Sequence, residues 1–310
     1  MFTYKIFNNI AEDGLNILDG NDFHIDEIDP DSLIIRSQNL SNNDFNKSLK
    51  CIGRAGAGTN NIPVKDATDK GIVVFNTPGA NANAVKELVV CGMLLSSRGI
   101  IQGNIYSKTL SGQNSVELNK SMESQKKNFK GNELKGKTLG IIGAGSIGTE
   151  TIKLAKPFFK NILAYDPFLS EQQIHEKGAI KSDLNQLSSK CDFIVILCNL
   201  DQSTKGMINE TFLSNMKQSA YIFNLSRGPV INEGHLEKAL ENKVISGAGL
   251  DVTNTEPISL DSKLLSFNNV VITPHALCWT DECFNDIAEE AIKSILNFID
   301  KKPILNQVNL

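Results

Sequence analysis

One short segment, Gly143-Ala-Gly145-Ser-Ile-Gly148, constrains the fold of this 310-residue chain more than any other. An apolar run, Leu139 to Ile142, comes directly before it, and a stretch compatible with a helix follows. Glycines at this spacing permit a tight turn from strand to helix and let the helix pack close to the strand. The segment therefore predicts the first strand, turn and helix of a parallel α/β sheet.

The same segment predicts a binding site for a dinucleotide. Gly145 lets a pyrophosphate approach the backbone, and the helix N-terminus at Ser146 and Ile147 offers free N–H groups and partial positive charge. Asp166 ends the next apolar run, NILAYDP, where it can accept both ribose hydroxyls of NAD and would repel the extra phosphate of NADP. Pro167 belongs to the same predicted contact. The alternative is a glycine turn that binds nothing.

Short apolar runs alternate with helical patterns along the chain, which is typical of β-α-β units. A first series of four runs and a second series of six are separated by a polar connector with some helix, residues 102–137. Two long helices are predicted, over 80–99 and 280–301. The predicted class is α/β, with two Rossmann-like doubly wound parallel-sheet domains and a cleft between them. The runs are KIFNNI, SLIIRS, LKCIGRAG, GIVVFNTP, then KTLGIIGAG, NILAYDP, CDFIVILCN, SAYIFNLSRG, VISGAGLDV and NVVITPH.

Charge and composition exclude several classes of protein. The net charge of −4 offers no general field for nucleic acid or anionic membrane, and no stretch approaches the roughly 18 apolar residues of a membrane span. The six cysteines form no C-x-x-C pair and no zinc-finger spacing, so we expect no metal site. Reduced thiols and a start without a long apolar leader predict a cytoplasmic protein.

Two other glycine-rich patterns are weaker. The segment Ala144-Gly-Ser-Ile-Gly148 resembles the G-x-S-x-G turn of serine hydrolases, but alanine stands where the first glycine should be. The segment Arg54-Ala55-Gly56-Ala-Gly58 lacks the third glycine of a dinucleotide loop and a ribose acid at the right distance. It is more consistent with a loop that contacts a small anion.

Six segments in this order resemble the D-isomer-specific 2-hydroxyacid dehydrogenases over essentially the whole chain. Two of them, GRAGAGTNNI and NTPGANANAVKELV, look most like the D-3-phosphoglycerate dehydrogenases of that family. The resemblance implies an NAD-dependent oxidoreductase. The other four segments are KTLGIIGAGSIG, NLSRGPVINEGHLEKAL, GLDVTNTEP and ITPHALCWT.

The resemblance implies a catalytic triad of Arg227, Glu256 and His275. Reduction of a 2-keto acid leaves an alkoxide-like oxygen that needs a proton, which a histidinium can supply and a neutral histidine can take back. Glu256 would hydrogen-bond the other imidazole nitrogen and favour the charged ring. Arg227 would hold the substrate carboxylate and carbonyl with its planar donors.

Further contacts follow from the same resemblance. Ser226 and Asp251 would face the nicotinamide end of the cofactor. Asn199 stands where many members have a proline and would lie close to the cofactor. The loop Arg54-Ala55-Gly56 would bind the substrate carboxylate, and Arg36 is a candidate cation for a phosphate. Ala276-Leu277-Cys278-Trp279 is bulkier than the residues that usually follow the histidine of phosphoglycerate enzymes.

The predicted domains are a discontinuous substrate-binding domain, residues 1–97 and 283–310, and an NAD-binding domain, residues 98–282. Helix 80–99 would link them and pack across a homodimer interface. The predicted reaction interconverts 3-phosphoglycerate and 3-phosphohydroxypyruvate, the entry to serine biosynthesis. A glyoxylate, hydroxypyruvate or other small keto-acid reductase is the alternative, and an NAD-sensing binding protein without enzymatic activity is a third. The predicted last helix lies close to the end of the sequence, so we expect no appended regulatory domain.

Overall fold

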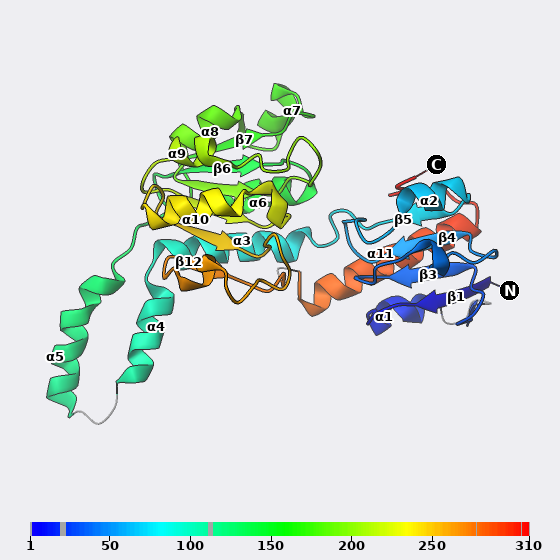
Figure 1. Ribbon diagram of the computed structural model, residues 1–310, viewed down its shortest axis with the longest axis horizontal. Coiled ribbons are helices and arrows are strands. Elements are labelled where there is room, and N and C mark those ends of the chain that lie inside the picture. Colours follow the sequence, from blue (N-terminus) through cyan, green and yellow to red (C-terminus); the bar gives the residue numbers. More distant parts are fainter. Residues whose placement is uncertain (1, 19–22, 111–113, 277, 305, 310) are drawn as a thin grey trace. The chain divides into compact units, whose positions relative to one another are not determined.

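The computed structural model describes residues 2–18, 23–110, 114–276, 278–304 and 306–309. The chain divides into two compact units (Figure 1). Unit 1 comprises Met1–Ala84 and Cys278–Leu310, and unit 2 comprises Val85–Leu277. Unit 1 is therefore assembled from the two ends of the chain, and unit 2 is inserted between them.

Unit 1 is built on a five-stranded parallel sheet in the order β2-β1-β3-β4-β5. The strands of the middle of this sheet are apolar and buried on both faces, as parallel sheets require. Its strands are β1 (Phe2–Ile6), β2 (Phe23–Ile25), β3 (Ser32–Ile35), β4 (Cys51–Arg54) and β5 (Val73–Phe75). Its helices are α1 (Glu12–Leu15), η1 (Asn16–Leu18), η2 (Asn42–Asp44), α2 (Val64–Asp69) and α11 (Asp281–Ile299).

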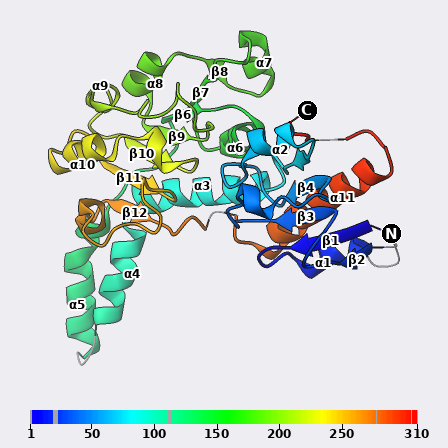
Figure 2. The ribbon, with the colours of Figure 1, turned by 45° about the vertical axis from the view of Figure 1, so that its right-hand side comes forward.

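The long helix α11 packs its apolar side against one face of the unit 1 sheet (Figure 2). Two glycines make this contact close. A Cβ atom at Gly14 of α1 would lie 2.5 Å from the Cβ atom of Ala288, and one at Gly53 of β4 would lie 2.7 Å from Ile295 Cδ1. The absence of side chains there lets α1 and β4 approach α11, so the end of the chain completes the core begun at its start.

Unit 2 contains a seven-stranded parallel sheet in the order β12-β11-β10-β9-β6-β7-β8. The order reverses at β6, the strand that precedes the glycine-rich segment. Its strands are β6 (Thr138–Ile142), β7 (Asn161–Tyr165), β8 (Ile180–Lys181), β9 (Phe193–Ile196), β10 (Tyr221–Asn224), β11 (Gly247–Leu250) and β12 (Val270–Ile272). Its sheet-covering helices are α6 (Ser146–Ala155), α7 (Glu171–Glu176), α8 (Leu184–Lys190), α9 (Glu210–Ser214), η4 (Gly228–Val230), α10 (Glu233–Glu241) and η5 (Lys263–Ser266).

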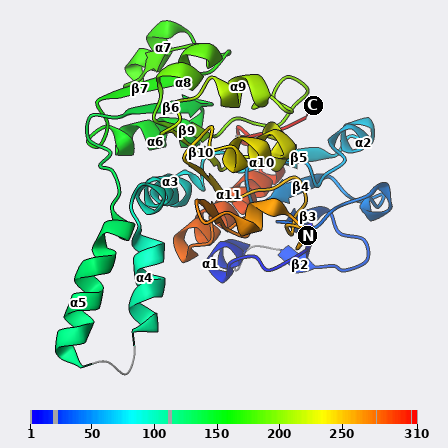
Figure 3. The same cartoon turned by 60° about the vertical axis from the view of Figure 1, so that its left-hand side comes forward.

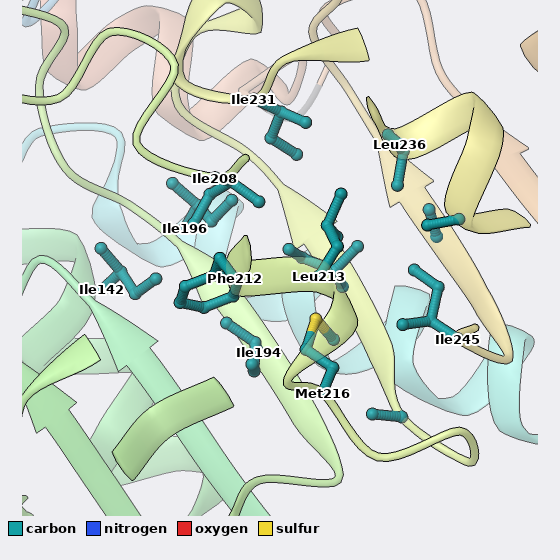
Figure 4. Packing of buried hydrophobic residues seen from close by; sticks show 14 of the residues in the cluster. Ile142, Ile194, Ile196, Ile208, Phe212, Leu213, Met216, Ile231, Leu236 and Ile245 are labelled. Carbon is teal, nitrogen blue, oxygen red and sulfur yellow. The ribbon is translucent and has the colours of Figure 1, made fainter. Parts of the chain in front are cut away.

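Aliphatic side chains of the central strands and the covering helices form one core on a face of this sheet (Figure 4). Ile194 and Ile196 of β9 and Ile222 of β10 are fully buried there, against Leu213 and Met216 of the α9 region. Burial of this kind stabilises a fold by about 1.5–3 kcal/mol for each large aliphatic side chain. Strands β9 and β10 of this core lead directly into the loops that carry Asn199 and Arg227.

Helical elements connect the two series of strands. Helix α3 (Ala82–Ser97) is followed by α4 (Ile100–Thr109) and α5 (Ser115–Gln125), and then by η3 (Lys126–Phe129). Helices α4 and α5 form an antiparallel hairpin that projects away from the sheet of unit 2 (Figures 1 and 3). The Tyr106 hydroxyl and the Ser121 hydroxyl are hydrogen-bonded across this hairpin at 2.9 Å.

The predicted α/β class with two parallel sheets is confirmed, as are the long helices at 80–99 and 280–301. The first strand begins earlier than the run KIFNNI, at Phe2, and strands β2 and β8 were not predicted. The division between the units falls after Ala84 and after Leu277, because Ala84 in the first turn of α3 packs in the core of unit 1. The predicted functional limits, 1–97 with 283–310 and 98–282, stay a prediction.

Candidate functional site

The glycine-rich segment forms the turn between β6 and α6. Gly143 has φ +95°, a conformation that favours glycine, and its N–H donates to the Tyr165 carbonyl at 2.9 Å. A Cβ atom at Gly143 would lie 2.7 Å from the Cys198 backbone nitrogen. A residue with a side chain would therefore collide with the loop that follows β9.

The other two glycines differ in what surrounds them. A Cβ atom at Gly148 would lie 2.1 Å from the Gly143 carbonyl oxygen, so glycine is needed for α6 to pack against β6. Gly145 has open space around its missing side chain, with no heavy atom within 4 Å among the described residues. Gly145 is also the N-cap of α6 and carries no side chain that could cap the helix. An open backbone at an uncapped helix N-terminus fits a pyrophosphate group.

Asp166 follows β7 and is fixed against this turn. Its Oδ2 accepts a hydrogen bond from the Ala144 N–H at 2.9 Å, and its Oδ1 accepts one from the Phe168 N–H at 3.0 Å. A carboxylate has about four acceptor positions, so both oxygens keep capacity for ribose hydroxyls. Pro167, beside it, is exposed. Asp166, which is predicted to accept hydrogen bonds from the ribose, is thus held next to the glycine turn that is predicted to bind the phosphates.

His275 and Glu256 form a close pair in unit 2. The Nδ1 atom of His275 lies 2.8 Å from Oε2 of Glu256, and their side chains are 47% and 40% exposed. His275 lies just beyond β12 with φ +53°, an unusual value for a residue other than glycine. A carboxylate bonded to Nδ1 orients the ring and leaves Nε2 to exchange a proton.

Asp251, directly after β11, fixes the segment that carries the histidine. Its carbonyl oxygen accepts the His275 N–H at 2.9 Å. Its Oδ1 accepts the Thr273 hydroxyl at 2.6 Å and the Ala276 N–H at 2.9 Å. Asp251 is 3% exposed, so these bonds are largely shielded from water. From the sequence, only a cofactor contact was predicted for Asp251. Its hydrogen bonds to the segment that carries His275 were not predicted.

Arg227 lies in the loop after β10, and its neighbours order that loop. The buried Asn224 accepts hydrogen bonds from Ser226 N–H at 3.2 Å and from the Ser226 hydroxyl at 3.0 Å, and its Nδ2 donates to the Arg227 carbonyl at 2.9 Å. The Arg227 Nη1 donates to the Ser226 carbonyl at 2.6 Å. Asn224 was missed by sequence reasoning, although a buried amide at the end of an apolar strand is a recognisable signal.

The loop of Arg227 and the loop of Glu256 touch through their backbones. A Cβ atom at Gly228 would lie 2.1 Å from the backbone carbon of Thr253. The Thr253 N–H in turn points at Glu256 Oε1 at 3.4 Å. Strands β10, β11 and β12 are adjacent and parallel, so Arg227, Glu256 and His275 all follow strands at one edge of the sheet.

Asn199, the remaining residue predicted at the cofactor, lies in the exposed loop after β9. Its carbonyl accepts the Thr204 hydroxyl at 2.8 Å. Cys198 beside it is shielded, and burial raises the pKa of its thiol to about 11. The contact of Asn199 with the cofactor stays a prediction.

The predicted substrate residues lie in unit 1. Arg54 is the last residue of β4, followed by the buried Ala55 and Gly56. Gly56 has φ +138°, and a Cβ atom there would lie 1.7 Å from Nη1 of Arg54. The Arg54 guanidinium therefore folds over Gly56, whose N–H donates to the Thr77 hydroxyl at 2.8 Å.

Arg36 follows β3, the neighbour of β4, and the register pairs Ile35 with Arg54. The two arginines thus leave adjacent strands at the same edge of the unit 1 sheet. The Arg36 guanidinium lies over the rings of Trp279 and Phe284. The role of Trp279 in holding an arginine was not predicted. Leu277, in the bulky segment before it, lies outside the described residues.

In the described part of the chain, no group of three or more His, Cys, Asp or Glu side chains could hold a metal ion. In the same residues, no helix is long and apolar enough to span a membrane. Unit 2 thus carries the glycine turn, Asp166, Arg227 and the histidine–glutamate pair, and unit 1 carries the predicted substrate residues Arg36 and Arg54.

A doubly wound sheet with a glycine turn at its reversal point and a histidine–carboxylate pair at the same sheet's strand ends defines a dinucleotide-dependent oxidoreductase architecture. Residues 99–276 match the family described as D-isomer specific 2-hydroxyacid dehydrogenase, NAD binding domain. The chain belongs to this family, and NAD as the predicted cofactor is confirmed at the level of that domain.

Two curated relatives are similar over most of the chain. The D-3-phosphoglycerate dehydrogenase of Bacillus subtilis is 33% identical over 324 residues, covering 100% of this chain and 59% of the relative. The hydroxypyruvate reductase of Thermotoga maritima is 39% identical over 274 residues, covering 86% of this chain and 83% of the relative. The chain thus spans little more than half the length of the phosphoglycerate enzyme.

A solved structure has the same fold. The NAD-complexed D-isomer specific 2-hydroxyacid dehydrogenase of Lactobacillus delbrueckii ssp. bulgaricus matches with a TM-score of 0.81 and 23% identity, over 99% of this chain and 100% of that chain. At this identity the likeness supports the fold and carries no assignment of substrate.

Proposed function

We propose that this chain is an NAD-dependent oxidoreductase that interconverts a D-2-hydroxy acid and its 2-keto acid. The observation that carries the proposal is the 2.8 Å pair of His275 and Glu256, on the same sheet edge as the glycine turn. Family membership supports the same reaction type. The names of the two relatives, a dehydrogenase and a reductase of hydroxy and keto acids, agree with it.

The residues of the chain divide the work as follows. Gly145 and the N-terminus of α6 would bind the pyrophosphate, and Asp166 would accept the ribose hydroxyls. When bound, the nicotinamide supplies or accepts the hydride. His275 would donate a proton from Nε2 to the keto oxygen during reduction and remove it during oxidation, while Glu256 holds Nδ1. Arg227 would bind the substrate oxygens through its planar N–H groups and stabilise negative charge on them.

Asp166 would also set the preference between cofactors. Its carboxylate can accept both hydroxyls of the NAD ribose, whereas a 2′-phosphate would face a negative charge already held by the turn. We therefore assign NAD rather than NADP. Ser226 and Asp251 remain proposed contacts at the nicotinamide side, Asn199 remains a proposed cofactor contact, and Pro167 remains one at the ribose.

The substrate that we favour is 3-phosphoglycerate with 3-phosphohydroxypyruvate, the first step toward serine. Arg36 and Arg54 leave adjacent strands, and two cations at one edge suit an acid with two anionic groups. The name of the Bacillus subtilis relative supports this choice. Ala55 and Gly56 would contribute backbone to the carboxylate contact.

A hydroxypyruvate or glyoxylate reductase is the second candidate. The Thermotoga maritima relative bears the name hydroxypyruvate reductase and is the more similar of the two over the aligned residues. A non-enzymatic NAD-sensing protein is the third candidate, and it would need no histidine–glutamate pair.

A substrate panel tests the proposal. The rate of NADH oxidation should be measured with phosphohydroxypyruvate, hydroxypyruvate, glyoxylate and pyruvate, beside the variant His275→Gln. We expect turnover by the wild type, and a loss of at least about 10²-fold in kcat for the variant because the proton donor is gone. NADH binding of the variant should stay close to wild type. No turnover of any acid by the wild type would refute the enzymatic proposal.

We further propose that the chain forms a homodimer in the cytoplasm. The α4–α5 hairpin exposes Ile105 by 59% and Val116 by 76%, which is unfavourable for a free surface. A second copy of this chain, packed on the hairpin and on α3, would cover them. Light scattering after size-exclusion chromatography should give a dimer mass for the wild type and a monomer mass for Ile105→Lys. A monomeric wild type would contradict the assembly without affecting the chemistry.

A further inference from the structure

The proposed function does not explain why Arg36 rests on two aromatic rings. Its guanidinium carbon lies 5.3 Å from the centre of the Trp279 ring and 4.9 Å from that of Phe284. The two rings contact each other edge to face, with centres 5.5 Å apart and planes at 76°. All three residues belong to unit 1, and we call them the arginine platform.

The contact between the two rings has a local cause. Thr280 is the N-cap of α11, and its hydroxyl accepts the Cys283 N–H at 3.1 Å. Trp279 therefore stands just before the cap and Phe284 four positions inside the helix, the arrangement of a hydrophobic staple. Phe284 is also half-buried against the core of unit 1. The staple fixes the rings, but it does not require an arginine over them.

The backbone that carries Arg36 is fixed independently. Asn8, with φ +72°, accepts hydrogen bonds through Oδ1 from the N–H groups of Ser37 at 2.9 Å and Gln38 at 2.7 Å. The buried Asn61 donates through Nδ2 to the Gln38 carbonyl at 2.7 Å. Backbone and guanidinium are both held, so little conformational entropy remains to be lost when a ligand binds.

The platform leaves the charge of Arg36 uncompensated. Among the described residues, no Asp or Glu oxygen lies within 4.0 Å of its guanidinium nitrogens. Rings that cover the faces of a guanidinium do not occupy its N–H donors, which point outward in its plane. Two parallel N–H groups match the two oxygens of a carboxylate or phosphate.

We propose that Trp279 and Phe284 are specificity-determining residues, which hold Arg36 so that its N–H edge binds a second anionic group of the substrate. This inference rests on the proposed function and deepens it. The arginine itself would contact the ligand, and the two rings would act through it. Acids with a phosphate or a second carboxylate would be favoured over acids with one charge.

Binding measurements on the full chain, without cofactor, test the inference. Isothermal titration calorimetry should compare D-3-phosphoglycerate, tartronate and D-glycerate, which carry a phosphate, a second carboxylate and no second anion. We expect the wild type to bind at least one of the first two about tenfold or more tightly than D-glycerate. Phosphoglycerate alone would identify a phosphate site, and tartronate as well would identify a general site for a second anion.

Variants then separate the platform from general damage. Trp279→Ala should reduce this preference by about threefold, which is within the range for one lost cation–π contact, Arg36→Ala should abolish it, and the double variant should resemble Arg36→Ala alone. Trp279→Phe keeps an aromatic face and should keep the preference. Melting temperatures identify any variant that fails to fold. Trp279 is the only tryptophan, so its fluorescence in the wild type should change with the favoured acid and not with D-glycerate.

Several results would overturn the inference. The wild type could bind all three acids equally or bind none, Trp279→Ala could leave the preference unchanged, or it could weaken all ligands alike. Additive losses in the double variant would also show that Trp279 does not act through Arg36. The preference in binding together with no turnover of any keto acid would refute the proposed reaction and leave the platform intact.

Discussion

Gly145 and Gly148 stand three residues apart, yet alanine should affect the protein differently at each. At Gly145 the added methyl group meets no heavy atom within 4 Å among the described residues. Alanine is a poorer N-cap than glycine by roughly 1 kcal/mol, and it gains about 0.4–1 kcal/mol through the unfolded state. The free energy of unfolding of Gly145→Ala should therefore stay within about 1 kcal/mol of the wild type.

At Gly148 the methyl group would lie 2.1 Å from the Gly143 carbonyl oxygen and 3.0 Å from its carbon. Backbone cannot move aside as a flexible side chain can, and overpacking costs typically 1–3 kcal/mol. We expect Gly148→Ala to lower the melting temperature by several degrees in the absence of cofactor. A change of 1 kcal/mol corresponds to about 2–4 °C for domains of 150–250 residues.

Cofactor binding should distinguish the two variants in the opposite way, because Gly145→Ala should impair NADH binding although it barely changes stability. A pyrophosphate over Gly145 would collide with the new methyl group, so the NADH dissociation constant of Gly145→Ala should rise at least about tenfold, or about 1.4 kcal/mol. Calorimetric titration with NADH and thermal unfolding with and without it measure both effects. Wild-type NADH affinity in Gly145→Ala would refute the placement of the pyrophosphate. Wild-type stability in Gly148→Ala would refute the packing argument.

Three other perturbations test the site. Glu256→Gln should lower kcat by about 10²-fold while changing stability by less than about 1 kcal/mol, because the pair with His275 is partly exposed; steady-state kinetics with unchanged kcat would contradict the orienting role. Asp166→Ala should weaken NAD far more than NADP in binding titrations, and equal losses would contradict the ribose contact. Iodoacetamide at pH 8 should label Cys198 far more slowly in the folded protein than in the urea-unfolded chain, because the raised pKa of about 11 lowers the thiolate fraction of Cys198 by roughly two orders of magnitude; equal rates measured by peptide mass spectrometry would contradict the burial.

The sequence predicted the elements that have strong local signals. Buried parallel strands read as continuous apolar runs, so β6, β9 and β10 were found where they lie. Strand β2 is three residues long with two exposed, and β8 has only two residues, both exposed. Such short edge strands exist through pairing with a neighbour and leave no apolar run to detect.

The sequence predicts which residues belong to the candidate site, but it predicts few of the contacts that these residues make. The glycine spacing and the segments around Arg227, Glu256 and His275 are local patterns. The bonds of Asp251 to Thr273 and Ala276 depend on how β11 and β12 pair, which no local pattern encodes. The stacking of Arg36 on Trp279 joins the two ends of the chain, so it could be recognised only after unit 1 was assembled.

The backbone contact between Gly228 and Thr253 has a consequence for anyone redesigning this protein. The backbones of the two loops are in direct contact, with no room for a Cβ atom at Gly228. Lengthening or rebuilding either loop alone should therefore shift the Arg227 guanidinium or the Glu256 carboxylate. New substrate preferences should therefore be sought by exchanging side chains of the first and last segments of the chain. Libraries that randomise residue 228 would consist largely of misfolded proteins.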